Sequence, residues 1–317
     1  MAKGIITLRN TGGGGISSVP ARIICDTTNL QTTDAVRVQS MTNPTSVETV
    51  DVVTPGEYLI FDVDGRDYYK ISLVQEIDNE DVEIVSVYRT LGFGEATVVN
   101  VFDKTHLSGI QTILNNHQQS NLLNIGDEVT ITVAGSEWTM QIGDINHYGS
   151  NDVVFVSKHI WAVMAACSNQ EYYYDTTPLV AKVRTFYNGM IEEEKALVKA
   201  IQKPQHTSAY QSSSWSSFTD YVWVPNVWEM VGNSGQIGQY YGTCPIALSQ
   251  LDIFKTIANR VKMYNNVSTP WWNCDGAANG YGGGSFTIIN AEGVASSASG
   301  KGQTYGVVPC FILTADI

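Results

Sequence analysis

The sequence predicts an α+β chain that is mainly β. Three observations point to this class. Glycine, tyrosine and tryptophan are abundant (28, 16 and 7 of 317 residues), and only 15% of residues are charged. Runs of alternating β-branched and aromatic residues recur along the chain, whereas helical spacing is rare. This profile is typical of β-rich proteins whose loops display aromatic and small polar side chains, and it is unusual for a metabolic enzyme.

The charge balance excludes several classes of partner. The chain has 18 basic and 31 acidic residues, which gives a net charge of −13 and a pI near 4.7. Such a chain repels phosphate backbones and anionic lipid, and no basic run offsets this, so we expect no nucleic-acid partner. We also expect no membrane insertion, because no stretch of 18 apolar residues exists. The N-terminus lacks the apolar core of a secretory signal.

Residues 1–45 are predicted to be an extended attachment arm. The run TGGGGISS (11–18) disfavours a helix or strand, because glycine loses much conformational entropy when it is ordered. The run SMTNPTS (40–46) ends the segment with turn-forming residues. Two short strands, ARIICD and AVRVQS, are expected between them. We interpret the arm as a segment pinned by neighbouring proteins, in a homo-oligomer or a larger array.

Residues 46–104 are predicted to form a small β-sandwich or meander of immunoglobulin-like size. Four or five antiparallel strands are expected from runs such as EYLIFDV and VEIVSVYRT. Asp64-Gly65 lies between two of these runs and predicts a tight hairpin turn. The motif DVDGRD (62–67) has three aspartates around a glycine, but its spacing fits a hairpin better than a calcium loop.

Residues 105–121 are predicted to be a helix and linker, and residues 122–317 a second, α+β module. Three strands are expected over 125–158, and 159–168 begins a helix or continues the third strand. Two helices are expected over 177–203, the second with an apolar stripe (Met190, Leu197, Val198, Ile201) and with Glu192, Glu193 and Glu194 in its first turn. DYVWVPNVWEM (220–230) and YGVVPCFILT (305–314) are each predicted as one strand.

Catalytic and metal motifs are missing from the sequence. The five histidines never pair at ligand spacing, and HExxH, CxxC and GxSxG do not occur. We therefore expect neither an enzyme nor a metal or other cofactor. The five cysteines are scattered, which favours reduced buried thiols, with a Cys244–Cys274 disulfide as the alternative in an oxidising compartment.

Aromatic residues supply the candidate core and binding positions. Adjacent strand residues face opposite ways, so at least one of Trp271 and Trp272 is expected in the core. A candidate displayed face consists of residues among glycines and asparagines: Tyr240, Tyr241, Asn279 and Tyr281. Such loop residues are adaptable contacts, and ordinary packing of a loop-rich module is the alternative.

The stretch 122–317 resembles a module of unassigned function found in bacterial surface proteins and in phage tail or virion proteins. The resemblance rests on a WWLR-like tryptophan pair (Trp271, Trp272), a strand ending in the turn Asn290 to Gly293, and a G-x-R-P-x-F strand at Gly306, Pro309 and Phe311. Asn273, Cys274 and Val308 depart from the family pattern. Two arginines are thereby lost, which weighs against a shared electrostatic ligand site.

The resemblance implies a C-type lectin fold with Trp271, Trp272, Val307 and Phe311 in its core. The EPN, QPD and WND motifs of calcium-dependent sugar binding are absent, so the fold is expected to serve as a scaffold or contact surface.

From this we expect a bacteriophage virion structural protein that is assembled in the host cytoplasm. It would decorate the capsid or belong to the tail or baseplate. The arm would bind other virion proteins, and the displayed face would contact a host-surface glycan or protein. The alternative is a bacterial cell-surface adhesin. An enzyme of the sulfatase-modifying type ranks third.

Overall fold

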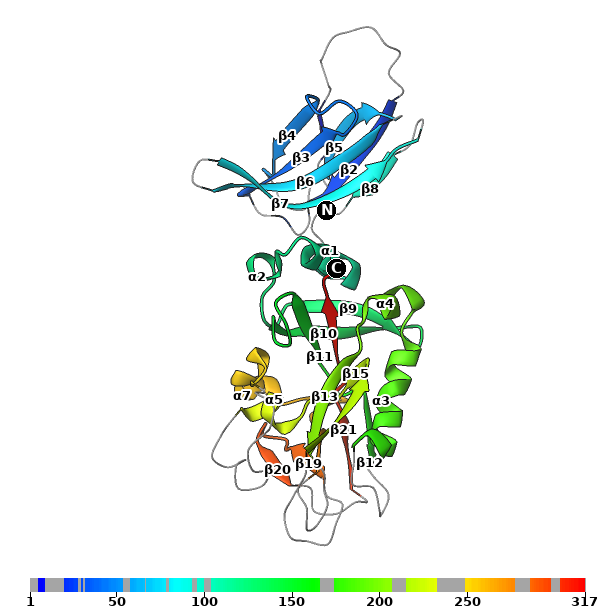
Figure 1. Cartoon of the computed structure of the whole chain (residues 1–317), viewed down its shortest axis with the longest axis vertical. Coiled ribbons are helices and arrows are strands. Elements are labelled where there is room, and N and C mark those ends of the chain that lie inside the picture. The colour runs from blue at the N-terminus through cyan, green and yellow to red at the C-terminus, as the bar shows by residue number, and fades with distance from the viewer. Residues whose placement is uncertain are drawn as a thin grey trace. The chain divides into compact units, whose positions relative to one another are not determined.

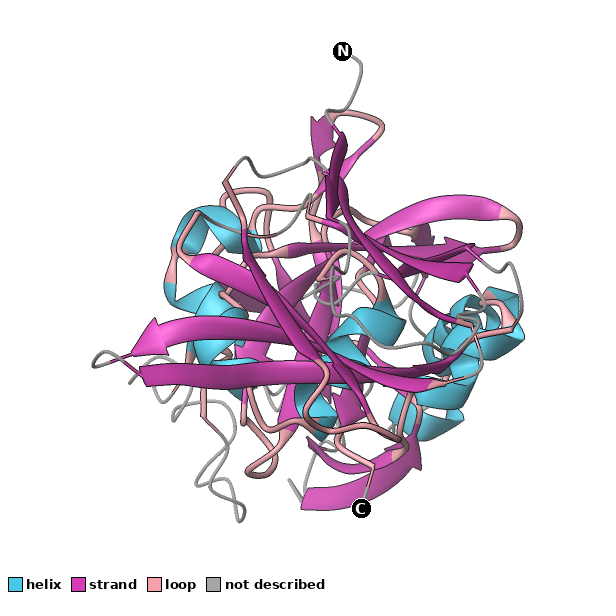
Figure 2. Ribbon diagram, turned by 90° about the horizontal axis from the view of Figure 1, so that it is seen from above, coloured by secondary structure: helices cyan, strands magenta, loops and turns pink. Residues whose placement is uncertain are grey.

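The computed structural model divides the chain into two compact units, Met1–Gln118 (unit 1) and Gln119–Ile317 (unit 2). Strands far outnumber helices in the described part of each unit (Figures 1 and 2). The prediction of a mainly β, α+β chain is therefore confirmed. The structure describes residues 5–8, 20–27, 30, 32–53, 58–65, 67–77, 80–92, 96–99, 104–165, 174–206, 215–232, 249–276, 286–297 and 303–316.

Unit 1 contains two four-stranded sheets and a helix. The β2 sheet has the order β1-β5-β2-β8, made of Ile5–Leu8, Tyr58–Asp64, Pro20–Asp26 and Ala96–Val99. The β3 sheet has the order β4-β3-β6-β7, made of Val47–Asp51, Asp34–Ser40, Tyr68–Ile77 and Glu80–Thr90. Helix α1 (Leu107–Asn115) ends the unit.

Strand β3 shows why these segments form sheets. Burial alternates along it: Val36 and Val38 are buried, whereas Arg37 faces outward and donates to Asp81 at 2.6 Å. A period of two is what one buried sheet face requires. Strand β2 alternates in the same way, burying Ala21, Ile23 and Cys25.

The prediction of an arm over 1–45 is wrong for its second half. Strand β2 pairs with both β5 and β8, and β3 pairs with both β4 and β6. Strands with two neighbours and a buried face belong to the domain core, which therefore begins well before residue 46. The glycine run lies outside the described residues. Strand β1 pairs with β5, so part of the N-terminal segment also belongs to a sheet.

The predicted hairpin at Asp64-Gly65 is also wrong. Strands β5 and β6, on either side of this turn, belong to different sheets. The turn instead carries the chain from one sheet to the other. A Cβ at Gly65 would lie 2.5 Å from the carbonyl oxygen of Gly92, so only glycine permits this close approach. Two pairings in this unit, β1 with β5 and β2 with β8, are parallel rather than antiparallel.

Unit 2 contains two five-stranded sheets. The β11 sheet has the order β15-β22-β11-β10-β9, made of Val222–Trp223, Cys310–Thr314, Asp152–Ser157, Ser136–Ile145 and Glu128–Val133. The β18 sheet has the order β12-β21-β18-β19-β20, made of Ala162–Ala165, Thr304–Val307, Trp271–Gly276, Phe286–Ile289 and Ala295–Ser297. All six residues of the central strand β11 are buried, so the sheet is covered on both faces at this strand.

Smaller elements complete unit 2. Two-stranded ladders join β13 to β14 and β16 to β17. Their bounds are Ile201–His206, Trp215–Asp220, Met263–Tyr264 and Val267–Ser268. The helices are α2 (Gln119–Leu122), α3 (Pro178–Gly189), α4 (Glu192–Leu197), α5 (Val227–Val231) and α7 (Ile257–Arg260), with 3₁₀ turns at Tyr174–Thr176 and Asp252–Lys255. The predicted linker 105–121 is thus mostly helix α1, and α2 begins unit 2.

Helix α3 follows its sequence signals closely. Thr177 caps its N-terminus by accepting from the backbone N–H of Val180, and Pro178 occupies the first turn. The second predicted helix is shorter than expected. Helix α4 keeps the three glutamates in its first turn, but Val198 bridges to Leu313 and Ile201 begins β13. The expected apolar stripe is therefore split between a helix and two strand pairings.

Two predicted strands are each divided in the structure. In 220–230, β15 ends at Trp223 and Asn226 caps helix α5. In 305–314, β21 ends at Val307 and β22 begins at Cys310, and the two strands lie in different sheets. Pro225 and Pro309 stand at these breaks, where a residue without an N–H cannot extend a ladder.

Candidate functional site

The predicted core residues all lie in unit 2, on strands of its two five-stranded sheets. Trp271 and Trp272 are on β18, Val307 is on β21 and Phe311 is on β22, and all four are buried. The indole Nε1 of Trp271 donates to the carbonyl of Arg260 at 2.9 Å, and that of Trp272 donates to the carbonyl of Met164 at 2.8 Å. Adjacent strand residues point to opposite faces, so the burial of both tryptophans shows that β18 is covered on both faces at this position.

The four residues of the predicted displayed face, Tyr240, Tyr241, Asn279 and Tyr281, lie outside the described residues. The turn Asn290 to Gly293 that follows β19 is described. The N–H of Gly293 donates to the carbonyl of Asn290 at 3.0 Å, and Gly293 has φ +81°. The left-handed conformation of Gly293 lets the chain reverse direction tightly after β19.

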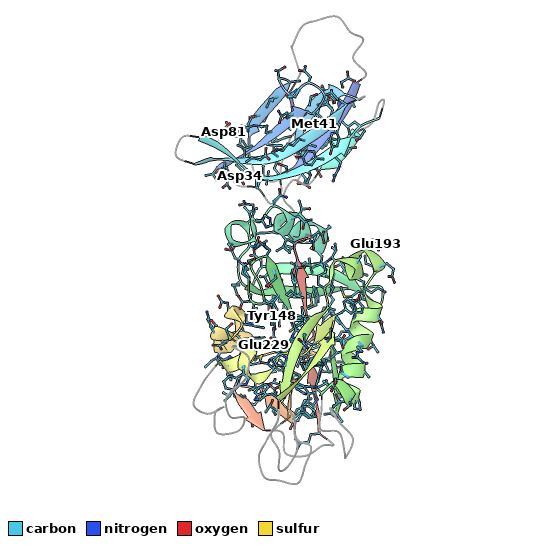
Figure 3. All side chains as sticks on the ribbon, in the orientation of Figure 1. Asp34, Met41, Asp81, Tyr148, Glu193 and Glu229 are labelled. Carbon is cyan, nitrogen blue, oxygen red and sulfur yellow. The ribbon has the colours of Figure 1, made fainter. Side chains whose placement is uncertain are left out.

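A cluster of buried polar side chains lies inside unit 2. It was not predicted from the sequence. Its centre is an ion pair between Lys203 on β13 and Glu229 on α5, and neither side chain has any exposed surface. Tyr148, from the turn between β10 and β11, bonds to both partners. Figure 3 shows Tyr148 and Glu229 next to each other in unit 2. We call these three residues the Lys203 cluster.

Local structure holds Glu229 in place. Asn226 and Glu229 form a capping box: the Asn226 side chain accepts from the Glu229 N–H at 2.8 Å, and Glu229 Oε2 accepts from the Asn226 N–H at 3.0 Å. The other oxygen, Oε1, bonds to Lys203 and Tyr148. Asn followed three residues later by Glu is a helix-start signal that can be read from the sequence, but it lies here inside an apolar run that was predicted to be one strand.

Aromatic rings surround the ammonium group of Lys203. Its Nζ lies 4.9 Å from the ring centre of Tyr148 and 5.1 Å from that of Trp223. Contacts of this kind stabilise a cation that has lost its water. Burial lowers the pKa of Lys203 and raises the pKa of Glu229. Desolvation of the charged form is the largest cause of both shifts, and the charge of Asp275 also raises the pKa of Glu229. The shifts bring the neutral amine and the neutral carboxylic acid closer in free energy to the ion pair.

Polar atoms around the Lys203 cluster have no hydrogen-bond partner among the described residues. They are Nε1 of Trp223, Nδ2 of Asn226 and both amide atoms of Asn273. Asn273, Cys274 and Asp275 continue β18 beyond the tryptophan pair, and all three are buried. Cys274 is a buried free thiol in the structure, and Cys244, its partner in the alternative disulfide, lies outside the described residues. The residues that depart from the WWLR-like pattern therefore form part of a buried polar core.

The turn between β10 and β11 aims Tyr148 at this core. Asp152 accepts from the backbone N–H of His147 at 2.9 Å and from that of Tyr148 at 3.0 Å. Asp144 bonds to His147 Nδ1 at 2.8 Å and accepts from the N–H of Asp252 at 3.2 Å. Burial raises the pKa of Asp152 to about 6, although hydrogen bonds from the backbone N–H groups of His147 and Gly149 oppose the shift.

This turn also brings together a serine, a histidine and an aspartate, the residue types of a nucleophilic triad. Ser249 Oγ lies 3.4 Å from His147 Nδ1, the same nitrogen that contacts Asp144. A proton relay needs the serine on one ring nitrogen and the aspartate on the other. In this geometry the three residues hold the turn and do not activate the serine.

Metal-binding clusters and membrane-spanning helices are both absent from the described ranges. These ranges contain no group of three or more histidine, cysteine, aspartate or glutamate side chains placed to bind a metal ion. None of their helices has both the length and the apolar character needed to cross a bilayer.

No protein-family model, curated protein or solved structure matches this chain.

Proposed function

We propose that the chain is a bacteriophage virion structural protein. In this proposal unit 1 is an immunoglobulin-like attachment domain, and unit 2 is a C-type-lectin-like module that is displayed on the capsid, tail or baseplate. The observation that carries the proposal is that three of the resembling elements belong to one sheet or to the turn that follows it, whereas Phe311 lies in the other sheet. The tryptophan pair on β18, the Asn290 to Gly293 turn after β19 and Gly306 on β21 belong to one sheet.

Unit 1 offers a surface suited to protein contacts. Tyr68 and Tyr88 stack on neighbouring strands with ring centres 5.6 Å apart, and both side chains are more than 40% exposed. The side chain of Met41 is also exposed, and the backbone N–H of Met41 donates to the carbonyl of Tyr68 at 2.8 Å. Rigid exposed aromatics of this kind are enriched at protein interfaces. We propose that this patch, together with the N-terminal segment, contacts other virion proteins or further copies of the chain.

The displayed function is assigned to unit 2. Tyr240, Tyr241, Asn279 and Tyr281 are proposed to contact a glycan or protein on the host surface. This assignment rests on their residue types, because loop tyrosines and asparagines supply adaptable contacts at low entropic cost.

Fractionation of a lysate tests the proposal. Particles from the phage or prophage that encodes the chain are purified on a density gradient and analysed by quantitative mass spectrometry. We expect the chain in the particle fraction at a fixed copy number relative to the major capsid protein, with immunogold label on the particle surface. Recovery in the cell-envelope fraction, with none on particles, would overturn the proposal and favour the adhesin.

A further inference from the structure

The Lys203 cluster places an amine and a carboxyl group in contact where water cannot reach. Nζ of Lys203 bonds to Oε1 of Glu229, and both side chains are fully buried. Oε2 of Glu229 is occupied by the backbone N–H of Asn226 at 3.0 Å. Tyr148 accepts from the lysine and donates to Oε1. The two oxygens of Glu229 therefore have distinct environments, and a hydroxyl group connects Nζ to only one of them.

We propose that Lys203 and Glu229 condense to form an intramolecular amide bond, a modification site that covalently joins strand β13 to helix α5. The inference does not depend on the virion proposal, because it follows from the geometry of unit 2 alone.

The reaction needs the neutral amine and the neutral carboxylic acid. Nζ of Lys203 attacks Cδ of Glu229 to form a tetrahedral intermediate. The amine proton passes through the Tyr148 hydroxyl to Oε1, and the Cδ–Oε1 bond then breaks. Oε1 leaves with two protons as water, and Oε2 becomes the amide carbonyl. Amine and acid become amide and water, so the step balances without an oxidant or any other reactant.

Each contact matches a requirement of this step. The N–H of Asn226 polarises the oxygen that remains, where negative charge develops. The hydrogen bonds through Tyr148 run from the attacking nitrogen to the departing oxygen. Desolvation brings the pKa values of the two groups towards each other, which makes the neutral pair more accessible.

Proximity and burial favour the product. Holding two reacting groups in contact is worth an effective concentration of about 10⁵–10⁸ M in favourable cases. The released water leaves a site with no exposed surface, so hydrolysis of the amide requires unit 2 to open first. The bond also removes a buried ion pair, whose desolvation otherwise opposes folding.

The mass of the full chain tests the proposal directly. The protein is unfolded in acid and denaturant and its intact mass is measured. We expect a mass lower than that of the sequence by one molecule of water. A mass equal to that of the sequence would show an ordinary salt bridge and would overturn the proposal.

Digestion locates the bond. An endoproteinase that cleaves before aspartate separates Lys203, in the fragment 175–219, from Glu229, in the fragment 220–251. We expect one branched species that contains both fragments, with a fragment-ion series that places the junction at these two residues. Two separate, unmodified peptides would contradict the proposal.

Variants identify the residues and supply the control. Lys203→Met should restore the full sequence mass. Lys262→Met should retain the deficit, because Lys262 is also buried but lies over the ring of Phe254 at 5.8 Å. Tyr148→Phe should lower the crosslinked fraction measured at a fixed time after folding. A deficit that persists in Lys203→Met would overturn the assignment.

Discussion

Truncating Trp272 to alanine is the sharpest test of the proposed core of unit 2. The side chain is 1% exposed, its indole donates to the carbonyl of Met164 at 2.8 Å, and its ring centre lies 4.8 Å from that of Tyr305. Removing a buried tryptophan costs the transfer free energy of the ring and leaves a cavity, together about 3–5 kcal/mol. The loss is a large share of the stability of a typical domain, about 5–15 kcal/mol.

Tryptophan fluorescence makes the measurement specific for unit 2. All seven tryptophans of the chain lie between residues 138 and 272, so none belongs to unit 1. Urea unfolding followed by this signal therefore reports unit 2 even when unit 1 unfolds separately. Taking a slope of about 3 kcal/mol per molar urea, the loss lowers the midpoint by about 1–2 M.

A matched control uses an exposed residue of the same unit. Val267 is 63% exposed, and Val267→Ala should change the unfolding free energy by no more than about 0.5 kcal/mol. If Trp272→Ala has the same midpoint as Val267→Ala, the reasoning that places this tryptophan in a close-packed core is refuted.

Three further predictions test other features. Gly293→Ala should destabilise unit 2 by about 1–3 kcal/mol in urea unfolding, because the turn has φ +81° and a Cβ would lie 2.8 Å from the carbonyl of Ile257. Asp152 has a pKa near 6 in the folded chain against 3.8 for an unperturbed group. The folded state therefore binds more protons between these values, and this residue makes unit 2 more stable as the pH falls from about 6 to about 4. Asp152→Asn should remove that contribution from unfolding curves measured across the range. Tyr281→Ala should leave thermal unfolding unchanged and weaken binding to host cells or to a neighbouring subunit.

Each of these outcomes has a clear opposite. An unchanged midpoint in Gly293→Ala would show that the turn tolerates a side chain. The unfolding free energy could change with pH by the same amount in Asp152→Asn and in the original chain. Groups other than Asp152 would then be responsible for the pH dependence. A large thermal shift in Tyr281→Ala would remove that residue from the proposed binding face.

The sequence alone determined the features that depend on neighbours along the chain. Alternating apolar residues fit strands β9 and β10, because a sheet with one buried face imposes a period of two. Strand β11 is instead an unbroken apolar run, which suits a strand that is buried on both faces. A helix was predicted from residue 177, and α3 begins there because the Thr177 cap and Pro178 both act on its first turn. The adjacent tryptophans indicated a core position through their size and their place in a strand.

Only the tertiary structure decided which segments share a sheet. Strands β21 and β22 form one apolar run in the sequence, yet they lie in different sheets. The strands on either side of Asp64-Gly65 also belong to two different sheets. Pairing partners far apart in sequence determine these assignments, and no local pattern encodes them. The Lys203 cluster depends on the same long-range order. Lys203, Glu229 and Tyr148 come from a strand, a helix and a turn, and their chemistry arises only when folding brings them together and excludes the water that would otherwise separate them.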